Sequence, residues 1–311
     1  MLLRRAAQTI PLLLIVSLLV FTLLHAAPGG PLTIYLENPG VRPEDIERLR
    51  KALGLDQPLA TQYVRWLTSF VRGDWGFSLS DGRPVAERML ERAPATLELS
   101  VASLIVALLA ALPLGIVSAM RRGGWLDRIG SAAALTGVSL PVFWFGLILQ
   151  LTIAIGLGWL PSSGRSAVFD SGFADRVSHL ILPAIVLAAV HAAGWSRYLR
   201  SSMLNILSQR FVLAGEARGI PRRVLVLRHA LRNAAGPLAT IVLMDAALLV
   251  SGAVVTESVF AWPGLGGLFT EAIVRRDYPV LMAFLMVTSI AVIALNFLAD
   301  VAHRALDPRV A

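Results

Sequence analysis

Long stretches without charge constrain this chain more than any other feature. No residue is charged from Leu99 to Met120, or from Ile129 to Gly164. A helix needs about 20 predominantly apolar residues to cross a bilayer. Only 15% of the 311 residues are charged, whereas a soluble domain has about 25%. We therefore expect an all-α integral membrane protein that contacts the lipid bilayer directly.

Six segments are predicted to cross the membrane. They are Ala6–Ala27, Leu99–Met120, the stretch 129–164, His179–Ser196, Asn233–Thr256 and Tyr278–Ala299. The alternative for the first is a signal peptide, but its apolar run exceeds the ~7–15 residues usual in that class. The third stretch is too long for one upright helix, and Pro141 is expected to kink it.

The arginines orient these spans. Six spans place both termini on one side of the membrane, and the short segments on that side hold 15 arginines. The two short loops on the other side hold four: Arg165, Arg176, Arg275 and Arg276. Short cytoplasmic loops are enriched in basic residues, so both termini are predicted to be cytoplasmic.

This topology divides the chain into three parts. Residues 1–27 form the cytoplasmic N-terminus and first span, residues 28–94 an extracytoplasmic helical cap, and residues 95–311 the transmembrane core. Within the cap, Pro43–Gly54 and Leu59–Val71 have the patterns of helices. The cap either packs on the outer membrane surface or also receives a partner there, and both interpretations stay open.

Several classes of site are disfavoured by the residue types present. The chain has no cysteine, and its five histidines lack the spacing of a metal site. The single lysine, Lys51, follows Arg50 rather than glycine, so it cannot complete a phosphate-binding G-x-x-x-x-G-K motif. The net charge of +8 is attributed to cytoplasmic retention rather than to nucleic acid. We expect no metal, no bound cofactor and no catalytic residues.

The cytoplasmic loop 197–232 is strongly basic, with eight arginines and one glutamate. Its simplest interpretation is an anchor that keeps the loop inside the cell. The loop also has a pattern: Gly219 and Pro221 should end a short helix over 211–218 and separate it from a third helix over 222–232. A short helix held between two longer ones suits docking into a groove on another protein.

Gly219, followed by His229-Ala-Leu-Arg-Asn233, resembles the cytoplasmic signature loop of ABC-importer permeases. It is most similar to the peptide-permease branch (dipeptide and oligopeptide), of the first-permease type. Further motifs of this resemblance run along the chain: Ala27–Pro31, Leu53–Pro58, Pro94–Glu98, Ser139–Pro141 with Phe143-Trp144, His179–Pro183, Glu257–Gly266, Arg276–Pro279 and Leu306–Arg309.

The resemblance implies a type I ABC importer permease fold in the bacterial plasma membrane. Such a subunit pairs with a second permease and binds two ABC ATPase subunits, which use ATP and Mg²⁺. A solute-binding protein delivers the peptide from outside. Nickel and glutathione permeases share the motifs and are the alternatives within the family. An alternative of another class is a membrane anchor or sensor that binds a signalling protein through the loop.

The resemblance also implies that the short helix and the signature couple the chain to the ATPase. The residues concerned are Phe211, Leu213, Ala214, Gly215, Glu216, Ala217, Arg218, Gly219, His229, Arg232 and Asn233. The family's Glu-Ala-Ala would occupy positions 213–215, which here read Leu-Ala-Gly, so Glu216-Ala217 is out of register. Phe211 stands where the peptide branch usually has tyrosine. Gly215 inside a short helix should cost about 1 kcal/mol relative to alanine.

Asp245 lies near the middle of the fifth predicted span. A carboxylate there costs about 2.5–3.5 kcal/mol, so it should face protein or a water-filled pathway. It either forms a structural hydrogen bond, with His191 as the candidate partner, or attracts an amine or cation in the pathway. Glu257 and Trp262 begin the next outer loop, which Pro263 and the glycines at 264, 266 and 267 should turn tightly back toward the pathway. The alternative for Trp262 is an anchor at the membrane interface.

Overall fold

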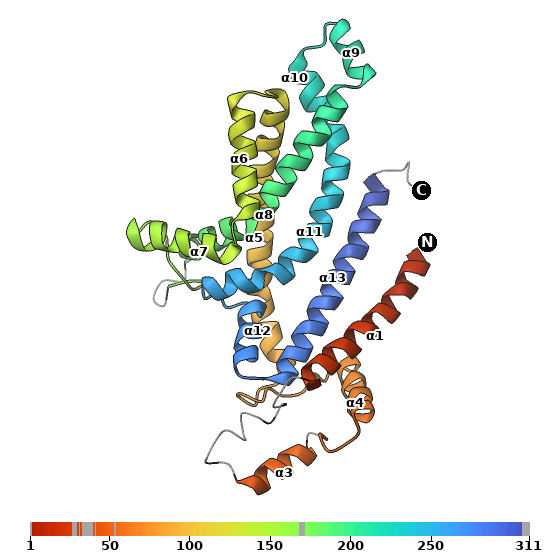
Figure 1. Ribbon diagram of the computed structural model, residues 1–311, viewed down its shortest axis with the longest axis vertical. Coiled ribbons are helices and arrows are strands. Elements are labelled where there is room, and N and C mark those ends of the chain that lie inside the picture. The colour runs from red at the N-terminus through yellow and green to blue at the C-terminus, as the bar shows by residue number, and fades with distance from the viewer. Residues whose placement is uncertain are drawn as a thin grey trace. The chain divides into compact units, whose positions relative to one another are not determined.

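The computed structural model describes residues 2–26, 30, 32, 40, 42–52, 54–167 and 172–306. In these ranges the chain is helical, and its only β-type pairing is an isolated bridge between Phe77 and Pro84 (Figure 1). It divides into two compact units: unit 1 comprises residues 1–95 and 263–293, and unit 2 residues 96–262 and 294–311. The motifs Ala27–Pro31 and Leu306–Arg309 lie mainly outside the described residues, as does Leu53.

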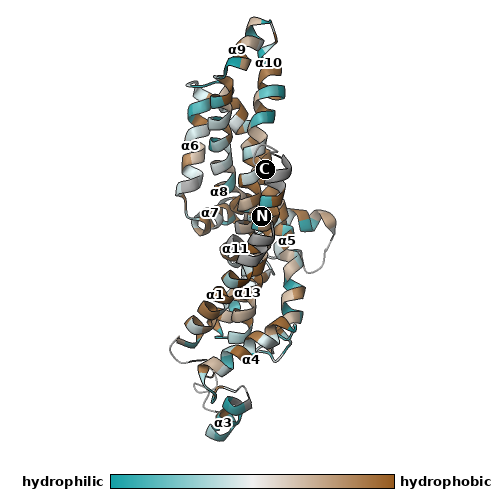
Figure 2. Cartoon of the chain, turned by 90° about the vertical axis from the view of Figure 1, so that its right-hand side faces the viewer, coloured by the Kyte–Doolittle hydropathy of each residue, from teal (hydrophilic) through white to brown (hydrophobic). Residues whose placement is uncertain are grey.

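Unit 1 contains the amino-terminal helices and the corner before the last helix. Its elements are α1 (Leu2–Ala26), α3 (Pro43–Ala52), α4 (Leu59–Val71), the start of α5 (Val85–Met120), α12 (Leu265–Val274) and the start of α13 (Tyr278–Leu306). The predicted helices after Pro43 and over Leu59–Val71 are confirmed. Helix α3 is largely hydrophilic (Figure 2). Helix α4 packs on α1 through Phe21, whose ring lies 5.8 Å from that of Trp66.

Unit 2 holds most of the remaining helices. They are the rest of α5, α6 (Trp125–Ser139), α7 (Val142–Leu149), the π-helix η1 (Gln150–Gly156), α8 (Phe173–Leu207), α9 (Arg210–Ala217), α10 (Arg222–Val224), the π-helix η2 (Leu225–Ala230) and α11 (Leu231–Val259). Helices α6 and α11 pack along α8. The core is rich in alanine, and such small residues let membrane helices approach closely. At Gly115, for example, a Cβ atom would lie 3.0 Å from Leu199.

The structure supports several membrane spans. Four helices are long and apolar enough to cross a bilayer, in α1, α5, α8 and α13, and the bent pair α6–α7 with η1 makes five. That pair turns by 106° around Pro141, which confirms the predicted kink. The predicted fifth span lies within α11, a helix of 29 residues, and a total of six crossings stays a prediction.

The predicted span Leu99–Met120 forms the second part of α5, which begins earlier, at Val85. One expectation from the sequence needs correction. The tight turn expected through Gly266 and Gly267 ends earlier, since both glycines lie inside α12. Leu265, Leu268 and Ala272 bury one face of that helix, and this burial outweighs the helix cost of glycine.

Candidate functional site

The basic loop folds into the predicted short helix between two longer ones. Helix α9 spans Arg210–Ala217, one residue earlier than predicted at each end. The chain then turns and enters α10, η2 and α11, which follow one another without a gap. Figure 1 shows α9 at the tip of unit 2, beyond the ends of α8 and α10. The signature residues His229, Arg232 and Asn233 lie in η2 and at the start of α11.

Helix α9 ends at Gly219. The amide of Gly219 donates to the carbonyl of Glu216 (2.9 Å), and the amide of Ile220 donates to that of Gly215 (3.1 Å). This pair of bonds is the Schellman motif, which needs a left-handed residue at Gly219, and the observed φ is +78°. A Cβ atom at Gly219 would meet nothing within 4 Å. Glycine is therefore favoured here by the backbone angle and not by lack of space.

At Gly215, by contrast, space is limited. A Cβ atom there would lie 2.7 Å from Cδ2 of Leu225, the first residue of η2, which is only 2% exposed. Glycine has a low helix propensity, but its lack of a side chain allows α9 to pack closely on η2. The sequence motif contained Gly215 but gave no sign of Leu225 as its partner.

The two faces of α9 differ. Val212 and Gly215 are buried, whereas Phe211 is 44% and Leu213 57% exposed. Two large apolar side chains of α9 are thus exposed on a basic loop. Ala214, Glu216, Ala217 and Arg218 are also exposed.

A groove beside α9 brings three predicted residues together. Phe211, His229 and Asn233 line it, and the side-chain amide of Asn233 donates to the backbone carbonyl of His229 at 2.8 Å. The groove has a volume of about 700 Å³, and its other lining residues are Ser202, Asn205, Ile206, Gln209 and Pro237. Ser202, Asn205 and Ile206 from α8, and Gln209 just before α9, were not predicted.

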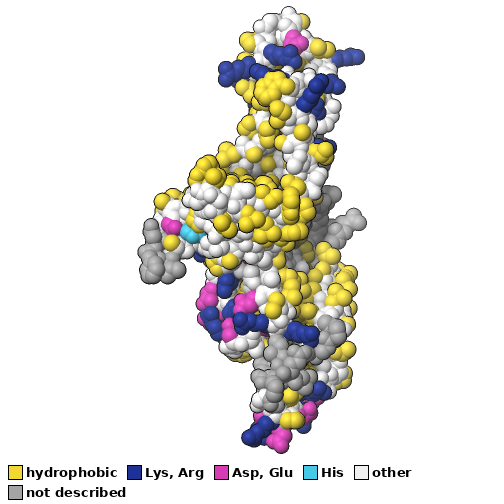
Figure 3. Space-filling model, turned by 60° about the vertical axis from the view of Figure 1, so that its left-hand side comes forward, with side chains coloured by type: hydrophobic (Ala, Val, Ile, Leu, Met, Phe, Trp, Pro, Cys, Tyr) yellow, Lys and Arg dark blue, Asp and Glu magenta, His cyan; other side chains and the backbone are white. Residues whose placement is uncertain are grey.

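Most of the positive charge of the loop is available to a partner. Among the described residues, Arg200 is the only one of the eight arginines in 197–232 with a carboxylate partner. Its Nε and Nη2 donate to Asp127 at 2.6 and 2.8 Å. Figure 3 shows basic side chains gathered at the end of unit 2 that α9 and α10 form. The surface around α9 therefore suits an acidic partner.

Asp245 has the predicted partner and one more. Its Oδ2 lies 3.8 Å from Nδ1 of His191, but the hydrogen bond of normal length comes from Nε1 of Trp195, at 2.7 Å. Trp195 follows His191 by one helical turn of α8, so both side chains reach the same carboxylate. The side chain of Asp245 is 28% exposed.

Glu257 and Trp262 are enclosed by protein. Glu257 is 0% and Trp262 1% exposed. Oγ1 of Thr96 donates to Oε1 of Glu257 at 2.6 Å, and the amide of Trp262 donates to the backbone carbonyl of Glu257 at 2.8 Å. The burial of the indole contradicts the alternative of a lipid-interface anchor, which requires a side chain exposed to lipid.

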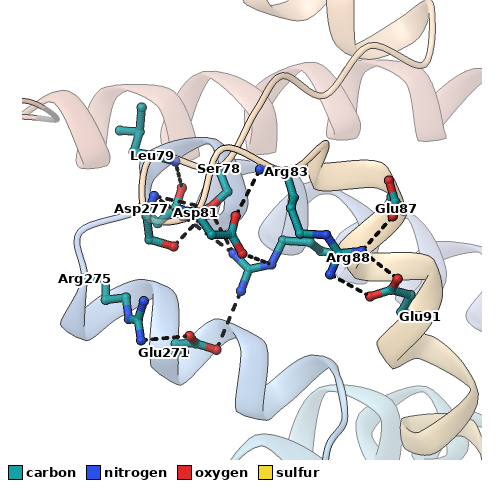
Figure 4. A network of polar contacts seen from close by, with 11 residues as sticks. Ser78, Leu79, Asp81, Arg83, Glu87, Arg88, Glu91, Glu271, Arg275 and Asp277 are labelled. Atoms are coloured by element: carbon teal, nitrogen blue, oxygen red, sulfur yellow. Dashed lines mark hydrogen bonds and ion pairs between the residues drawn. The ribbon is translucent and has the colours of Figure 1, made fainter.

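Unit 1 contains a polar network that the sequence did not reveal (Figure 4). Asp277, before α13, is 1% exposed and accepts hydrogen bonds from Oγ of Ser78 and from the amide of Leu79. Arg88 is 8% exposed and donates to Oγ of Ser78 at 2.9 Å, with Asp81 and Glu271 at 3.4 and 3.7 Å. The network ties the loop before α5 to the corner between α12 and α13.

The comparisons with known proteins agree with this architecture. Residues 111–311 match the family described as "Binding-protein-dependent transport system inner membrane component", and residues 1–100 match the amino-terminal part of such components. The chain belongs to this family. Family members are membrane permease subunits of ABC transporters and are not enzymes themselves. Among the described residues, no group of three or more histidines and acids is placed to hold a metal ion.

Relatives of this permease match nearly its whole length. The oligopeptide transport system permease AppB of Bacillus subtilis is 38% identical over 309 residues (99% of this chain, 98% of that protein). The dipeptide permease DppB of Escherichia coli K12 is 35% identical over 330 residues (99% and 97%). The glutathione permease GsiC of Salmonella typhimurium is 38% identical over 308 residues (99% and 97%).

Two solved structures share the fold of the permease. Both are inward-facing forms of the MetNI methionine ABC transporter. One has a TM-score of 0.59 at 20% identity and covers 71% of this chain and 96% of the other. The second has a TM-score of 0.55 at 19% identity and covers 70% and 96%.

Proposed function

We propose that this permease forms half of the translocation pathway of an ATP-driven peptide importer. The names of AppB and DppB support peptides as the substrate class. Glutathione is the second candidate, because GsiC is equally similar. A solute-binding protein delivers the substrate outside, and the second half of the pathway is another permease subunit.

The topology proposed has six spans with both termini in the cytoplasm and residues 28–94 outside. The arginine distribution supports it, since 15 arginines lie in the short segments on one side and four on the other. The acidic and basic residues of 28–94 balance, as expected for a long segment that crosses largely regardless of charge.

The packing of α9 carries the proposed coupling role. Val212 and Gly215 bury one face of α9, and Gly215 lies close to Leu225 of η2. The exposed Phe211 and Leu213 enter a cleft of the ATPase subunit. Closure of the ATPases then moves α9 and η2 together, and η2 continues directly into the predicted fifth span.

The pathway residues proposed are Asp245, His191, Glu257 and Trp262. Asp245 is partly exposed, and its carboxylate is suited to a protonated amine. His191 and Trp195 orient it. Glu257 and Trp262 are buried beside Thr96 in this conformation and reach the pathway only after a rearrangement of the outer end of unit 2.

Cysteine labelling tests the docking of α9. The chain has no cysteine, so Leu213→Cys introduces a single reactive thiol on the exposed face. A maleimide should label it in the isolated permease and fail to label it after assembly with the ATPase subunits. Arg72→Cys, exposed at the end of α4, is the matched control and should be labelled in both states. Equal labelling of Leu213→Cys before and after assembly would show that α9 is not the docking helix.

Transport assays test the substrate class. Proteoliposomes with the complete transporter should take up dipeptides or oligopeptides when the binding protein and ATP are present. Uptake of glutathione without peptide uptake would move the assignment to the second candidate. A chain that supports neither uptake nor ATP hydrolysis stimulated by a binding protein would fit the anchor or sensor alternative.

A further inference from the structure

A second groove of unit 2 lies between α6 and α8, away from α9. Its volume is about 700 Å³, and it is lined by Ser131, Leu135, Gly194, Arg197, Tyr198, Arg200 and Ser201. Gly194 is exposed, and a Cβ atom there would meet nothing within 4 Å. Glycine thus leaves open space on α8 between the longer side chains of the groove.

In the predicted topology, both walls of the groove lie near a membrane surface. On α8, Arg197 and Tyr198 follow directly after the predicted span His179–Ser196. On α6, Ser131 lies just inside the predicted span that begins at Ile129. Tyr198 is 37% and Leu135 59% exposed. Exposed aromatic residues are typical of the headgroup region, so the groove opens where lipid headgroups meet acyl chains.

The charge of the groove is positive and available. Arg197 is exposed and forms no ion pair with any described residue. Arg200 is held by Asp127 through Nε and Nη2, and its Nη1 donates to no described residue. The guanidinium of Arg200 is therefore fixed in orientation, and both N–H groups of its Nη1 stay available. Ser131, Tyr198 and Ser201, each of which carries a hydroxyl group, line the same groove.

This combination recognises a phosphate ester. Arginine binds phosphate through several directed hydrogen bonds, and basic pockets between membrane helices on the cytoplasmic side hold anionic headgroups. Leu135 supplies an apolar surface for the beginning of an acyl chain. We infer that the α6–α8 groove is a binding site for an anionic phospholipid of the cytoplasmic leaflet, with Arg197 and Arg200 on its phosphate.

The same chemistry also suits free phosphate, and the same face also suits a second subunit. A lipid is favoured because the groove combines charge with an exposed apolar wall at the predicted membrane surface. The inference rests on the proposed topology. Lipid binding, however, needs neither ATP nor solute. The lipid site can therefore fail its binding test while transport is normal, and transport can fail while lipid still binds.

Two variants separate charge from shape. Arg197→Gln removes the unpaired cation and should weaken phosphatidylglycerol binding about fivefold, as expected for one basic residue near an anionic surface. Gly194→Leu fills the open space and should abolish saturable binding without disturbing the helix, because leucine is the better helix former. Gly194→Ala and Arg121→Gln, an exposed arginine outside the groove, are the controls and should stay within about twofold of the parent.

Native mass spectrometry of the full-length permease, alone and in its assembled transporter, measures this binding. The probes are dioleoyl phosphatidylglycerol, dioleoyl phosphatidylethanolamine and inorganic phosphate. We expect saturable binding of phosphatidylglycerol in both preparations, weaker binding of phosphatidylethanolamine, and no displacement by excess phosphate. Displacement of the lipid by phosphate would show that the groove binds a free anion and is not specific for a lipid. Binding that is lost on assembly would make the groove a subunit interface, and equal binding by Gly194→Leu would overturn the site altogether.

Discussion

Leu225 packs so closely on Gly215 that a Cβ atom at position 215 would lie 2.7 Å from its Cδ2. Leu225 is 2% exposed and begins the π-helix that leads into α11. Single π-helical turns are often found at functional sites. The contact packs α9 on η2, which leads into the predicted fifth span, and in the proposed mechanism this contact transmits the movement of the ATPase.

Gly215→Ala should therefore loosen α9, although alanine is the better helix former by about 1 kcal/mol. Buried Leu225 has to move aside, and we expect binding-protein-stimulated ATP hydrolysis to fall several-fold. Amide hydrogen exchange in α9 should become faster. Adding Leu225→Val makes room for the new methyl group and should restore part of the stimulation. If the Gly215→Ala variant has the same rates of amide hydrogen exchange and ATP hydrolysis as the parent, the contact is not required for coupling.

Substitutions of Gly219 test the backbone conformation at the end of α9. Its φ is +78° and the space around it is open, so a side chain is opposed by conformation, at about 1–2 kcal/mol for an ordinary residue. Gly219→Val should uncouple ATP hydrolysis from transport while co-purification of the subunits is unchanged. Gly219→Asn should keep most of the transport rate, because asparagine tolerates this conformation. Equal loss in both variants would indicate that the ATPase, and not the helix end, excludes a side chain.

Asp245→Asn separates the charge of the site from its structure. The amide oxygen of asparagine can still accept the hydrogen bond from Trp195, so expression and assembly should be preserved. A charge-assisted hydrogen bond contributes about 1.5–3 kcal/mol, and KM for peptides with a free amino terminus should rise about tenfold or more. Peptides with an acetylated amino terminus are the control and should be unaffected. Loss of expression without a change in substrate preference would assign Asp245 a structural role.

The helices and breaks of this chain could be predicted because their signals are local. Apolar runs marked the membrane helices, Pro141 marked the kink, and Gly219 with Pro221 marked the end of α9. The partners could not be predicted, because they depend on which faces meet. Leu225, which packs on Gly215, begins a π-helix that no sequence signal indicates, and Asp277 meets Arg88 across a long sequence separation. Gly266 and Gly267 looked like turn residues because the burial of their neighbours in α12 is not visible in the sequence.

The carboxyl group of Asp81 should make unit 1 sensitive to acid. Burial raises its pKa, but the hydrogen bond from the amide of Arg83, the bond with Ser78 and the charges of Arg88 and Arg83 outweigh burial, so the pKa lies below its ordinary value. A lowered folded-state pKa stabilises the fold above the unfolded pKa of about 3.9, and this stabilisation is lost as pH falls through the folded value. Between pH 5 and pH 3, the thermal unfolding midpoint of Asp81→Asn should therefore fall less than that of the parent. The difference should be small, because Asp81 is partly exposed and solvent screens its interactions. An identical acid profile would show that Asp81 does not contribute.

Arg88 should be far more important to unit 1 than its neighbour Arg83. Arg88 is the buried cation of the network, and its Nη1 lies 3.8 Å from Oδ2 of Asp277. Arg88→Met leaves Asp277, which is 1% exposed, without this positive charge. Removing one partner of a buried pair costs about 3–5 kcal/mol, so the thermal unfolding midpoint of the purified permease should fall strongly. Arg83→Gln is the control: Arg83 pairs with Glu87 and Glu91, all three side chains are largely exposed, and such pairs contribute about 0–1 kcal/mol. The double variant Arg88→Met with Asp277→Asn no longer has an unpaired buried carboxylate, so part of the fall in the thermal unfolding midpoint should be recovered. A similar midpoint for Arg88→Met and Arg83→Gln would mean that the network does not hold the α12–α13 corner in place.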